Sequence, residues 1–156
     1  MREPKQRGLP LPDEMDDTTY YFIREGNDEG VALRREGELE EAISRYDRVL
    51  SIKGDAAVVY NNRGEVRRKM QNYELAIEDY SRALQINPHF AVVYYNRGLA
   101  WCALNLPDRA YGDFTRAQEL NRALLKTHVQ LVKALKSGAM DRVCRAAEDP
   151  SPPSGL

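Results

Sequence analysis

Apolar side chains in the middle of the chain recur every three or four residues, which is the spacing of one face of an α-helix. Two such stretches follow one another, at 56–70 and 73–86, and Gln71-Asn72 between them supplies a turn. Pro88 stands just beyond Ile86, where its ring marks the end of a helix. We therefore predict two helices joined by a short turn. No segment reads as a strand, so an all-α chain is expected.

This helical pair is repeated along the sequence. The string AVVYNNRG at Ala57–Gly64 returns as AVVYYNRG at Ala91–Gly98, 34 residues later (91 − 57). Moving upstream by the same interval aligns Gly30 with Gly64 and Tyr46 with Tyr80. A fixed period of this length is typical of solenoid proteins. We therefore predict three copies of one helix-turn-helix unit.

Small residues recur inside the predicted helices. Gly64 and Gly98 lie in the first helix of their units, opposite Ala76 and Ala110 in the second helix. A glycine inside a helix costs about 1 kcal/mol relative to alanine. Close approach of the two helices is the physical reason we infer for that cost.

The period and its fixed residues resemble the tetratricopeptide repeat family. The second unit carries an aromatic residue, glycine, alanine and proline at the family's positions, and the third unit repeats most of them. The residues are Tyr60, Gly64, Ala76, Tyr80, Ala83 and Pro88, then Tyr94, Gly98, Ala110, Phe114 and Ala117. The first unit departs from the pattern at Gly26 and Gly54. The layout is similar to that of small members built of repeats alone.

The resemblance implies a repeat domain and its fold, whereas the composition of the two ends predicts disordered tails. We expect a disordered N-terminal tail at 1–16, a repeat domain at 17–138 and a mostly disordered C-terminal tail at 139–156. The repeats occupy about 23–56, 57–90 and 91–122, and 122–138 forms a capping helix. Met140–Ala147 also has the composition of a short helical segment. The expected fold is an α-solenoid, a right-handed superhelix of antiparallel helix pairs.

The resemblance also implies a concave groove, lined by the first helix of each repeat, that binds peptides or helices of partner proteins. In this register the candidate groove residues are Asn27, Val31, Arg34, Arg35, Val58, Asn61, Asn62, Glu65, Arg68, Lys69, Val92, Tyr95, Asn96, Leu99 and, at the groove's end, His128. Asn27, Asn62 and Asn96 can donate to and accept from a peptide backbone. The alternative is that these asparagines bond neighbouring helices.

Charge favours an acidic ligand for this groove. Arg24, Arg34, Arg35, Arg68 and Lys69 face Asp28 and Glu65. That is five positive against two negative side chains, although an ordinary solvated face would look the same. Family members that bind the acidic C-termini of chaperones use a two-carboxylate clamp. At the clamp positions this chain has Asn27, Val31, Asn62, Val92 and Asn96, and of these Asn62 alone agrees. We therefore expect the chaperone clamp to be absent.

Composition excludes several other functions. The formal net charge is −1, so we expect neither nucleic-acid nor membrane-surface binding. No run of about 18 apolar residues occurs, and the N-terminus lacks the apolar stretch of a secretory signal. Cys102 and Cys144 lie far apart without metal-ligand spacing, which favours a reducing, cytoplasmic location. Trp101 is expected to be a core residue.

Catalytic motifs are missing from the sequence. His89 and His128 have no cysteine or acidic partner at ligand or triad spacing, and Gly26 and Gly30 lack the Lys-Ser/Thr of a phosphate-binding loop. We therefore expect no enzymatic activity, no cofactor and no metal.

The predicted function is that of a non-enzymatic adaptor, scaffold or co-chaperone-like module that binds a segment of a partner protein. The alternative is a self-assembling module, which would use either the capping helix, with Leu124, Val132 and Leu135, or the open N-terminal repeat. A monomer is preferred.

Overall fold

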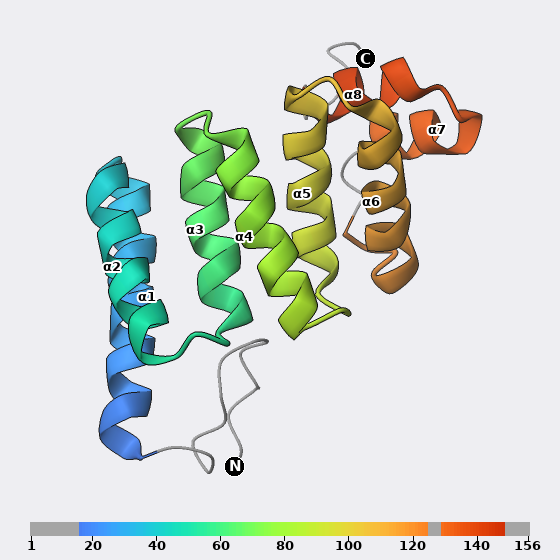
Figure 1. The fold of residues 1–156 in the computed structure, drawn as a ribbon. Helices are drawn as coiled ribbons and strands as arrows, with labels where there is room; N and C mark the ends of the chain where they lie inside the picture. The colour runs from blue at the N-terminus through green and yellow to red at the C-terminus, as the bar shows by residue number, and fades with distance from the viewer. Residues whose placement is uncertain (1–15, 125–128, 149–156) are drawn as a thin grey trace. The chain divides into compact units, whose positions relative to one another are not determined.

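A computed structural model of the protein describes residues 16–124 and 129–148, and every regular element in them is an α-helix. The chain forms two compact units, Met1–Pro88 and His89–Leu156, which we describe separately. Figure 1 shows that the two helices of each repeat lie side by side and run antiparallel. This arrangement confirms the predicted all-α fold of successive helix pairs.

Unit 1 contains the first two repeats. Its helices are α1 (Asp17–Glu36), α2 (Leu39–Ile52), α3 (Ala57–Lys69) and α4 (Tyr73–Ile86). The Asp16 carboxylate caps α1 by accepting a hydrogen bond from the Thr19 amide at 2.9 Å. Helix α1 pairs with α2, α3 pairs with α4, and α3 also packs against both helices of the first repeat.

The turn inside each repeat has the same left-handed backbone. Gly37, Gln71 and Asn105 occupy equivalent positions and have φ values of 89°, 63° and 56°. A positive φ is uncommon outside glycine, although asparagine tolerates it comparatively well. The three turns therefore share one backbone conformation at this position, although the residue differs from repeat to repeat.

Each core is built on an aromatic ring that rests on a helix glycine. A Cβ atom on Gly64 would lie 2.7 Å from the Tyr80 ring, and one on Gly98 would lie 2.7 Å from the Phe114 ring. The predicted close approach is present. Its nearest partner is the aromatic residue of the second helix, whereas we had expected the alanines Ala76 and Ala110.

Unit 2 holds the third repeat and two C-terminal helices. Its helices are α5 (Ala91–Ala103), α6 (Pro107–Leu120), α7 (Val129–Ser137) and α8 (Met140–Glu148). Residues 122–124 form a turn, so the expected capping helix at 122–138 is described as helical from Val129 onward. Helix α8 lies in the segment 139–156, which we expected to be mostly disordered, at the place of the short helical segment expected at Met140–Ala147.

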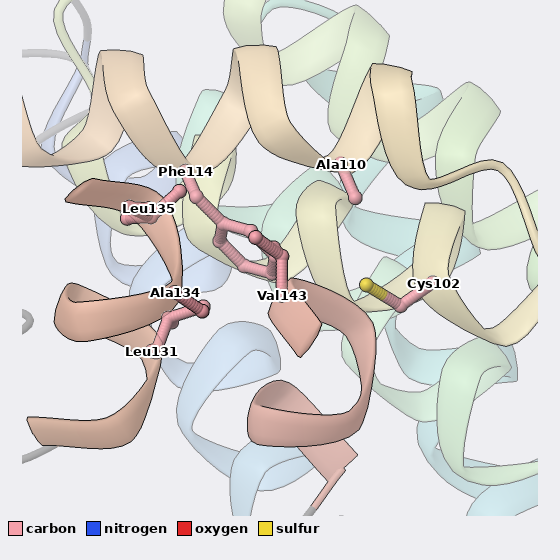
Figure 2. Close-up of a cluster of buried hydrophobic side chains, with 7 residues drawn as sticks. All are labelled: Cys102, Ala110, Phe114, Leu131, Ala134, Leu135 and Val143. Carbon is pink, nitrogen blue, oxygen red and sulfur yellow. The ribbon is translucent and has the colours of Figure 1, made fainter. Parts of the chain in front are cut away.

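The C-terminal helices close the core of unit 2. Figure 2 shows Phe114 of α6 beside Leu131, Ala134 and Leu135 of α7 and Val143 of α8. Phe114, Leu131 and Val143 are fully buried. Because α8 packs against both α5 and α6, it covers the apolar face that the third repeat would otherwise expose.

A disulfide joins Cys102 of α5 to Cys144 of α8. We took the wide spacing of these cysteines in the sequence, 42 positions, to favour a reducing location and did not predict the bond. The packing of α8 against α5 brings their side chains together. Among the described helices, none is long and apolar enough to cross a membrane.

Candidate functional site

The candidate site in unit 1 is the line along which α1 and α3 meet. The Asn62 side-chain amide donates a hydrogen bond to the Asn27 side-chain oxygen at 2.8 Å. Asn27 is 5% exposed, whereas Asn62 is partly exposed. This bond uses one of the two N–H groups of Asn62, so its second N–H and its oxygen can still face a ligand.

An ion pair continues the same line. Arg34 of α1 pairs with Glu65 of α3, and their side chains are 19% and 23% exposed. Arg35 and Lys69 follow in sequence at the ends of the two helices, and both are exposed. We call this set, Asn27, Arg34, Arg35, Asn62, Glu65 and Lys69, the α1–α3 surface. It presents a bonded amide pair, an ion pair and two exposed cations.

Other predicted groove residues of unit 1 have mixed positions. Val31, Val58 and Arg68 are partly exposed, whereas Asn61 is buried. The alternative interpretation of the groove asparagines was that they bond neighbouring helices. Asn27 of α1 and Asn62 of α3 do bond each other in this way.

The predicted groove residues of unit 2 face a different environment. Tyr95 packs on Phe114 with ring centroids 5.8 Å apart, and Leu99 packs on the same cluster as α7 and α8. Asn96 is 5% exposed and Val92 is partly exposed. The apolar part of the predicted groove is therefore engaged by the chain's own C-terminal helices. His128 lies outside the described residues.

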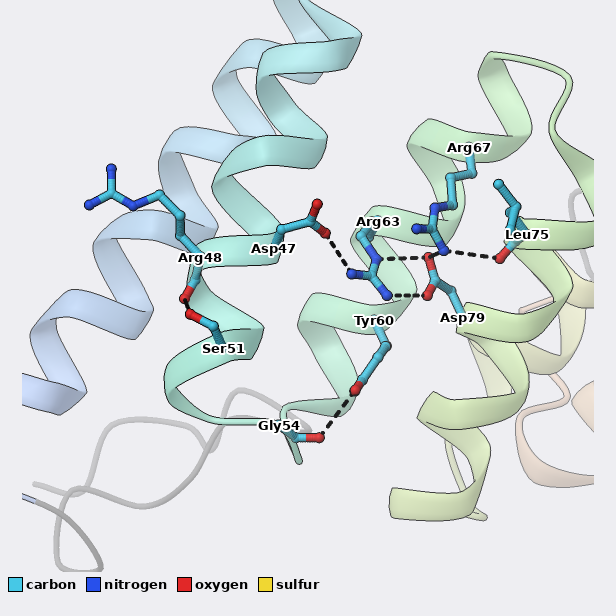
Figure 3. A network of polar contacts seen from close by, with 9 residues as sticks. All are labelled: Asp47, Arg48, Ser51, Gly54, Tyr60, Arg63, Arg67, Leu75 and Asp79. Atoms are coloured by element: carbon cyan, nitrogen blue, oxygen red, sulfur yellow. Dashed lines mark hydrogen bonds and ion pairs between the residues drawn. The ribbon is translucent and has the colours of Figure 1, made fainter.

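A buried charge network that we did not predict holds the second repeat together. Figure 3 shows Arg63 of α3 donating two hydrogen bonds to the Asp79 carboxylate of α4, at 3.1 and 2.7 Å. Arg67 donates a third at 2.9 Å, and Arg63 also reaches Asp47 of α2 at 2.6 Å. The network therefore ties α4 to α3 and α3 to the preceding repeat.

Burial perturbs both sides of this network. Desolvation raises the pKa of the Asp79 carboxyl above its usual value, against the opposing effect of Arg63. Desolvation also acts to lower the pKa of Arg63, but hydrogen bonds to Asp79 and Asp47 outweigh it, so this pKa is raised. Bidentate pairing of this kind fixes geometry as well as charge.

The third repeat contains the same pair with a different third member. Arg97 donates to Asp113 at 2.7 and 2.8 Å, and the Trp101 indole N–H donates to Asp113 at 3.1 Å. Arg109 lies over the Trp101 ring, 4.7 Å from its centroid. The recurrence of both arginine and aspartate after 34 residues was the sequence signal for this pair.

Chemically, the α1–α3 surface offers groups that can bind a ligand. Within residues 16–124 and 129–148, no cluster of three or more His, Cys, Asp or Glu side chains could hold a metal ion. Amide, guanidinium and ammonium groups on the α1–α3 surface can hydrogen-bond a peptide and attract carboxylates.

The chain is similar to known repeat domains. Residues 57–90 match the family model described as "Tetratricopeptide repeat". No curated protein matches the chain. The second TPR domain of human RPAP3, in complex with the HSP70 peptide SGPTIEEVD, is 27% identical with a TM-score of 0.64, and the match covers 67% of this chain and 87% of that chain.

Two further solved structures illustrate the range of neighbours. The second TPR of Spaghetti (RPAP3), bound to the HSP90 peptide SRMEEVD, is 26% identical with a TM-score of 0.63 over 67% of this chain and 99% of that chain. A crystal structure of MamA has a TM-score of 0.67 at 16% identity, covering 82% of this chain and 75% of that chain, and shows likeness of fold alone.

These neighbours correct one expectation. We expected the chaperone clamp to be absent, because Asn62 alone matched at the clamp positions. Two of the structures to which this chain is similar are bound to chaperone peptides that end in EEVD. The expectation is therefore not borne out, since a match of individual clamp residues is a narrower criterion than likeness of the whole domain.

Proposed function

Because this chain is a tetratricopeptide repeat protein, we propose that it is a non-enzymatic interaction module whose α1–α3 surface binds an acidic peptide segment of a partner protein. The observation that carries the proposal is the arrangement of this surface. Asn62 retains hydrogen-bonding groups beside its bond to Asn27, and the exposed cations Arg35 and Lys69 follow at the helix ends. The hydrogen-bonding groups of Asn62 suit a peptide backbone, and the two cations attract carboxylates.

The charge of unit 1 supports an acidic ligand. Along the predicted groove face of α1 and α3, five positive side chains stand against two negative ones, a local excess of three in a chain of net charge −1. Pairing of Arg34 with Glu65 removes one charge of each sign and leaves that excess unchanged. Such an excess attracts acidic segments and weakens as salt is raised.

The neighbours supply suitable probes. The peptides SRMEEVD and SGPTIEEVD, which are bound in two similar structures, both carry paired glutamates and a C-terminal aspartate. We propose chaperone tails of this kind as the first ligands to test. Binding at micromolar affinity would correspond to about −8 kcal/mol, which a preformed surface can supply.

The test is a fluorescence-anisotropy titration of labelled SRMEEVD, with SRMQQVN as the neutral control. We expect saturable binding of the acidic peptide and at least tenfold weaker binding of the neutral one. Lys69→Ala combined with Arg35→Ala should weaken binding about tenfold, since each exposed cation contributes a fraction of that. Asn62→Ala should also weaken it.

A matched control comes from Asn72→Ala. Asn72 is an exposed asparagine in the turn before α4, and its side chain makes no capping hydrogen bond. This variant should bind like the wild type. Equal affinity of the wild type for the acidic and the neutral peptide would contradict the proposal, as would a loss in Asn72→Ala as large as in Asn62→Ala.

The alternative, self-assembly, now depends on the open N-terminal repeat. Leu135 is 6% exposed and Val132 packs on the core of unit 2, so α7 uses its apolar face internally. Tyr21 is 64% exposed and Ile52 is 49% exposed in the first repeat. Sedimentation of the wild type and of Tyr21→Ala over a concentration series would separate a monomer from an assembly through this repeat.

A cytoplasmic location stays a prediction. The Cys102–Cys144 disulfide is the feature that bears against it, because disulfides persist mainly in oxidising compartments.

A further inference from the structure

The first repeat has a hollow on its surface where α1 and α2 pack together. Its volume is about 200 Å³. A cavity of about 150 Å³ is large enough to bind benzene, so this hollow has room for an aromatic ring. Around Gly26, it is lined by Phe22, Glu25, Glu29, Arg45, Arg48 and Val49.

The other repeats show what belongs in this position. Gly26 is equivalent to Tyr60 in the second repeat and to Tyr94 in the third. The guanidinium of Arg63 lies 5.4 Å from the centroid of the Tyr60 ring, and that of Arg97 lies 5.7 Å from the Tyr94 ring. The hollow is therefore the place where the other repeats put a tyrosine ring. Glu29 stands at the position of Arg63 and Arg97, so the guanidinium groups of this lining are those of Arg45 and Arg48 on α2.

The identity of residue 49 explains why residue 26 cannot fill the hollow. Val49 stands where the other repeats have Ala83 and Ala117. A Cβ atom on Gly26 would lie 2.5 Å from Cγ2 of Val49, which real Cβ atoms do not approach. Val49 is fully buried and forms the floor of the hollow. The first repeat thus has glycine and valine where the second has tyrosine and alanine. The two helices still pack together, but no tyrosine ring fills the hollow.

The charged lining can recognise a phenol. Arg48 already lies over an aromatic ring, with its guanidinium carbon 5.9 Å from the centroid of Phe22. Its equivalent in the third repeat, Arg116, has its pKa raised by hydrogen bonds to Glu119 and then to Tyr94. Arg45 and Arg48 both line the hollow, and guanidinium stacking on an aromatic face is favourable.

We propose that this hollow is a binding site for a tyrosine side chain presented by a partner protein. The terminal segments 1–15 and 149–156 contain no aromatic residue, so neither can supply the ring. The site uses none of the residues of the α1–α3 surface. It therefore stands whether or not that surface binds acidic peptides.

The test is an NMR titration of the full chain with N-acetyl-L-tyrosinamide, with N-acetyl-L-leucinamide as the apolar control. We expect saturable shifts of the Val49 methyl and Phe22 ring signals, with an affinity of about 1 mM for a ligand of this size. The leucine probe should bind at least tenfold more weakly, because it offers neither a ring nor a hydroxyl.

Two variants locate the binding. Gly26→Tyr combined with Val49→Ala restores the pair found in the second repeat and fills the hollow from within, so the tyrosine probe should no longer shift the Phe22 signals. Arg48→Ala should weaken the probe about fivefold, and Arg82→Ala, the equivalent exposed change in the second repeat, should not. The Arg48→Ala result stands even if the double variant does not fold.

The proposal is overturned if the wild type shows no saturable shift, if the leucine probe binds equally well, or if Arg82→Ala has the same effect as Arg48→Ala. Binding seen only after Tyr21→Ala would mean that Tyr21 of a second copy occupies the hollow. That outcome would overturn the assignment to a different partner protein.

Discussion

The two repeats of unit 1 pack equivalent helix pairs with side chains that are exchanged in charge and in size. In the second repeat, Arg63 of the first helix pairs with the buried Asp79 of the second. In the first repeat the signs are exchanged, and Glu29 pairs with Arg45 at 3.1 Å. The helix pair therefore accepts complementary charges of either polarity at these two positions.

Size is exchanged in the same way. The second repeat combines Tyr60 with Ala83, whereas the first combines Gly26 with Val49. Charge exchange preserves the contact between the helices, but size exchange leaves the surface hollow. A repeat can thus be changed pairwise while its helix pair is kept, and the imperfect exchange at Gly26 and Val49 creates the hollow that we propose as a binding site.

The largest expected effect is on the buried pair. Asp79→Ala should lower the free energy of unfolding by about 3–5 kcal/mol, because Arg63 and Arg67, whose side chains are 15% and 18% exposed, lose their shared carboxylate. Urea unfolding monitored by circular dichroism measures this change. Asp79→Asn, which keeps an acceptor of the same shape, should lose less. A loss below about 1 kcal/mol for Asp79→Ala would contradict the structural role of the network.

The next largest effect on stability is expected at two buried tyrosines, one in each repeat of unit 1. Tyr46 and Tyr80 are fully buried, and their hydroxyls have no hydrogen-bond partner in the described part of the chain. Desolvation raises the pKa of each from 10.0 to about 12, with nearby arginines opposing the shift. The unfolded chain therefore loses these protons near pH 10, whereas the folded chain keeps them until about pH 12.

Stability should accordingly fall as pH rises from about 10 to 12, by up to about 2–3 kcal/mol for each tyrosine. Tyr46→Phe combined with Tyr80→Phe should remove this part of the fall. At pH 7 the double variant should be at least as stable as the wild type, since it removes two unpaired hydroxyls and copies Phe114 of the third repeat. Thermal unfolding as a function of pH measures both. An unchanged alkaline limb would show that these hydroxyls are solvated.

The smallest effect is expected at the exchanged pair. Glu29→Ala should cost about 0.2–1 kcal/mol, because the Glu29 and Arg45 side chains are 45% and 44% exposed and water screens their attraction. The same urea titration detects it. If Glu29→Ala proved as costly as Asp79→Ala, the two repeats would not differ in the way their burial indicates.

The helical architecture could be predicted because its signals are local and periodic. Helix α4 has the predicted limits Tyr73–Ile86, and the partner glycines Gly64 and Gly98 do pack closely. What could not be predicted depends on contacts between distant segments. The disulfide joins residues far apart in sequence, and α8 follows Gly138, whose positive φ of 65° turns the chain back onto the third repeat.

The candidate site was predictable in composition but not in detail. The groove positions of α1 and α3 do meet, yet the register could not show that Asn62 would bond Asn27. The Glu29–Arg45 pair was missed for a different reason. A comparison of repeats that looks for identical residues passes over a pair in which both charges are reversed.

The Cys102–Cys144 bond also changes how the protein carries mechanical load. Tension applied to the two ends of the chain would pass from α5 to α8 through the sulfur atoms and bypass α6 and α7. The two cysteines are 42 positions apart in sequence, which corresponds to about 140 Å of extended chain at about 3.3 Å per residue. While the disulfide is intact, a pulling force cannot extend this segment. Reduction of the disulfide to two thiols allows the segment to extend.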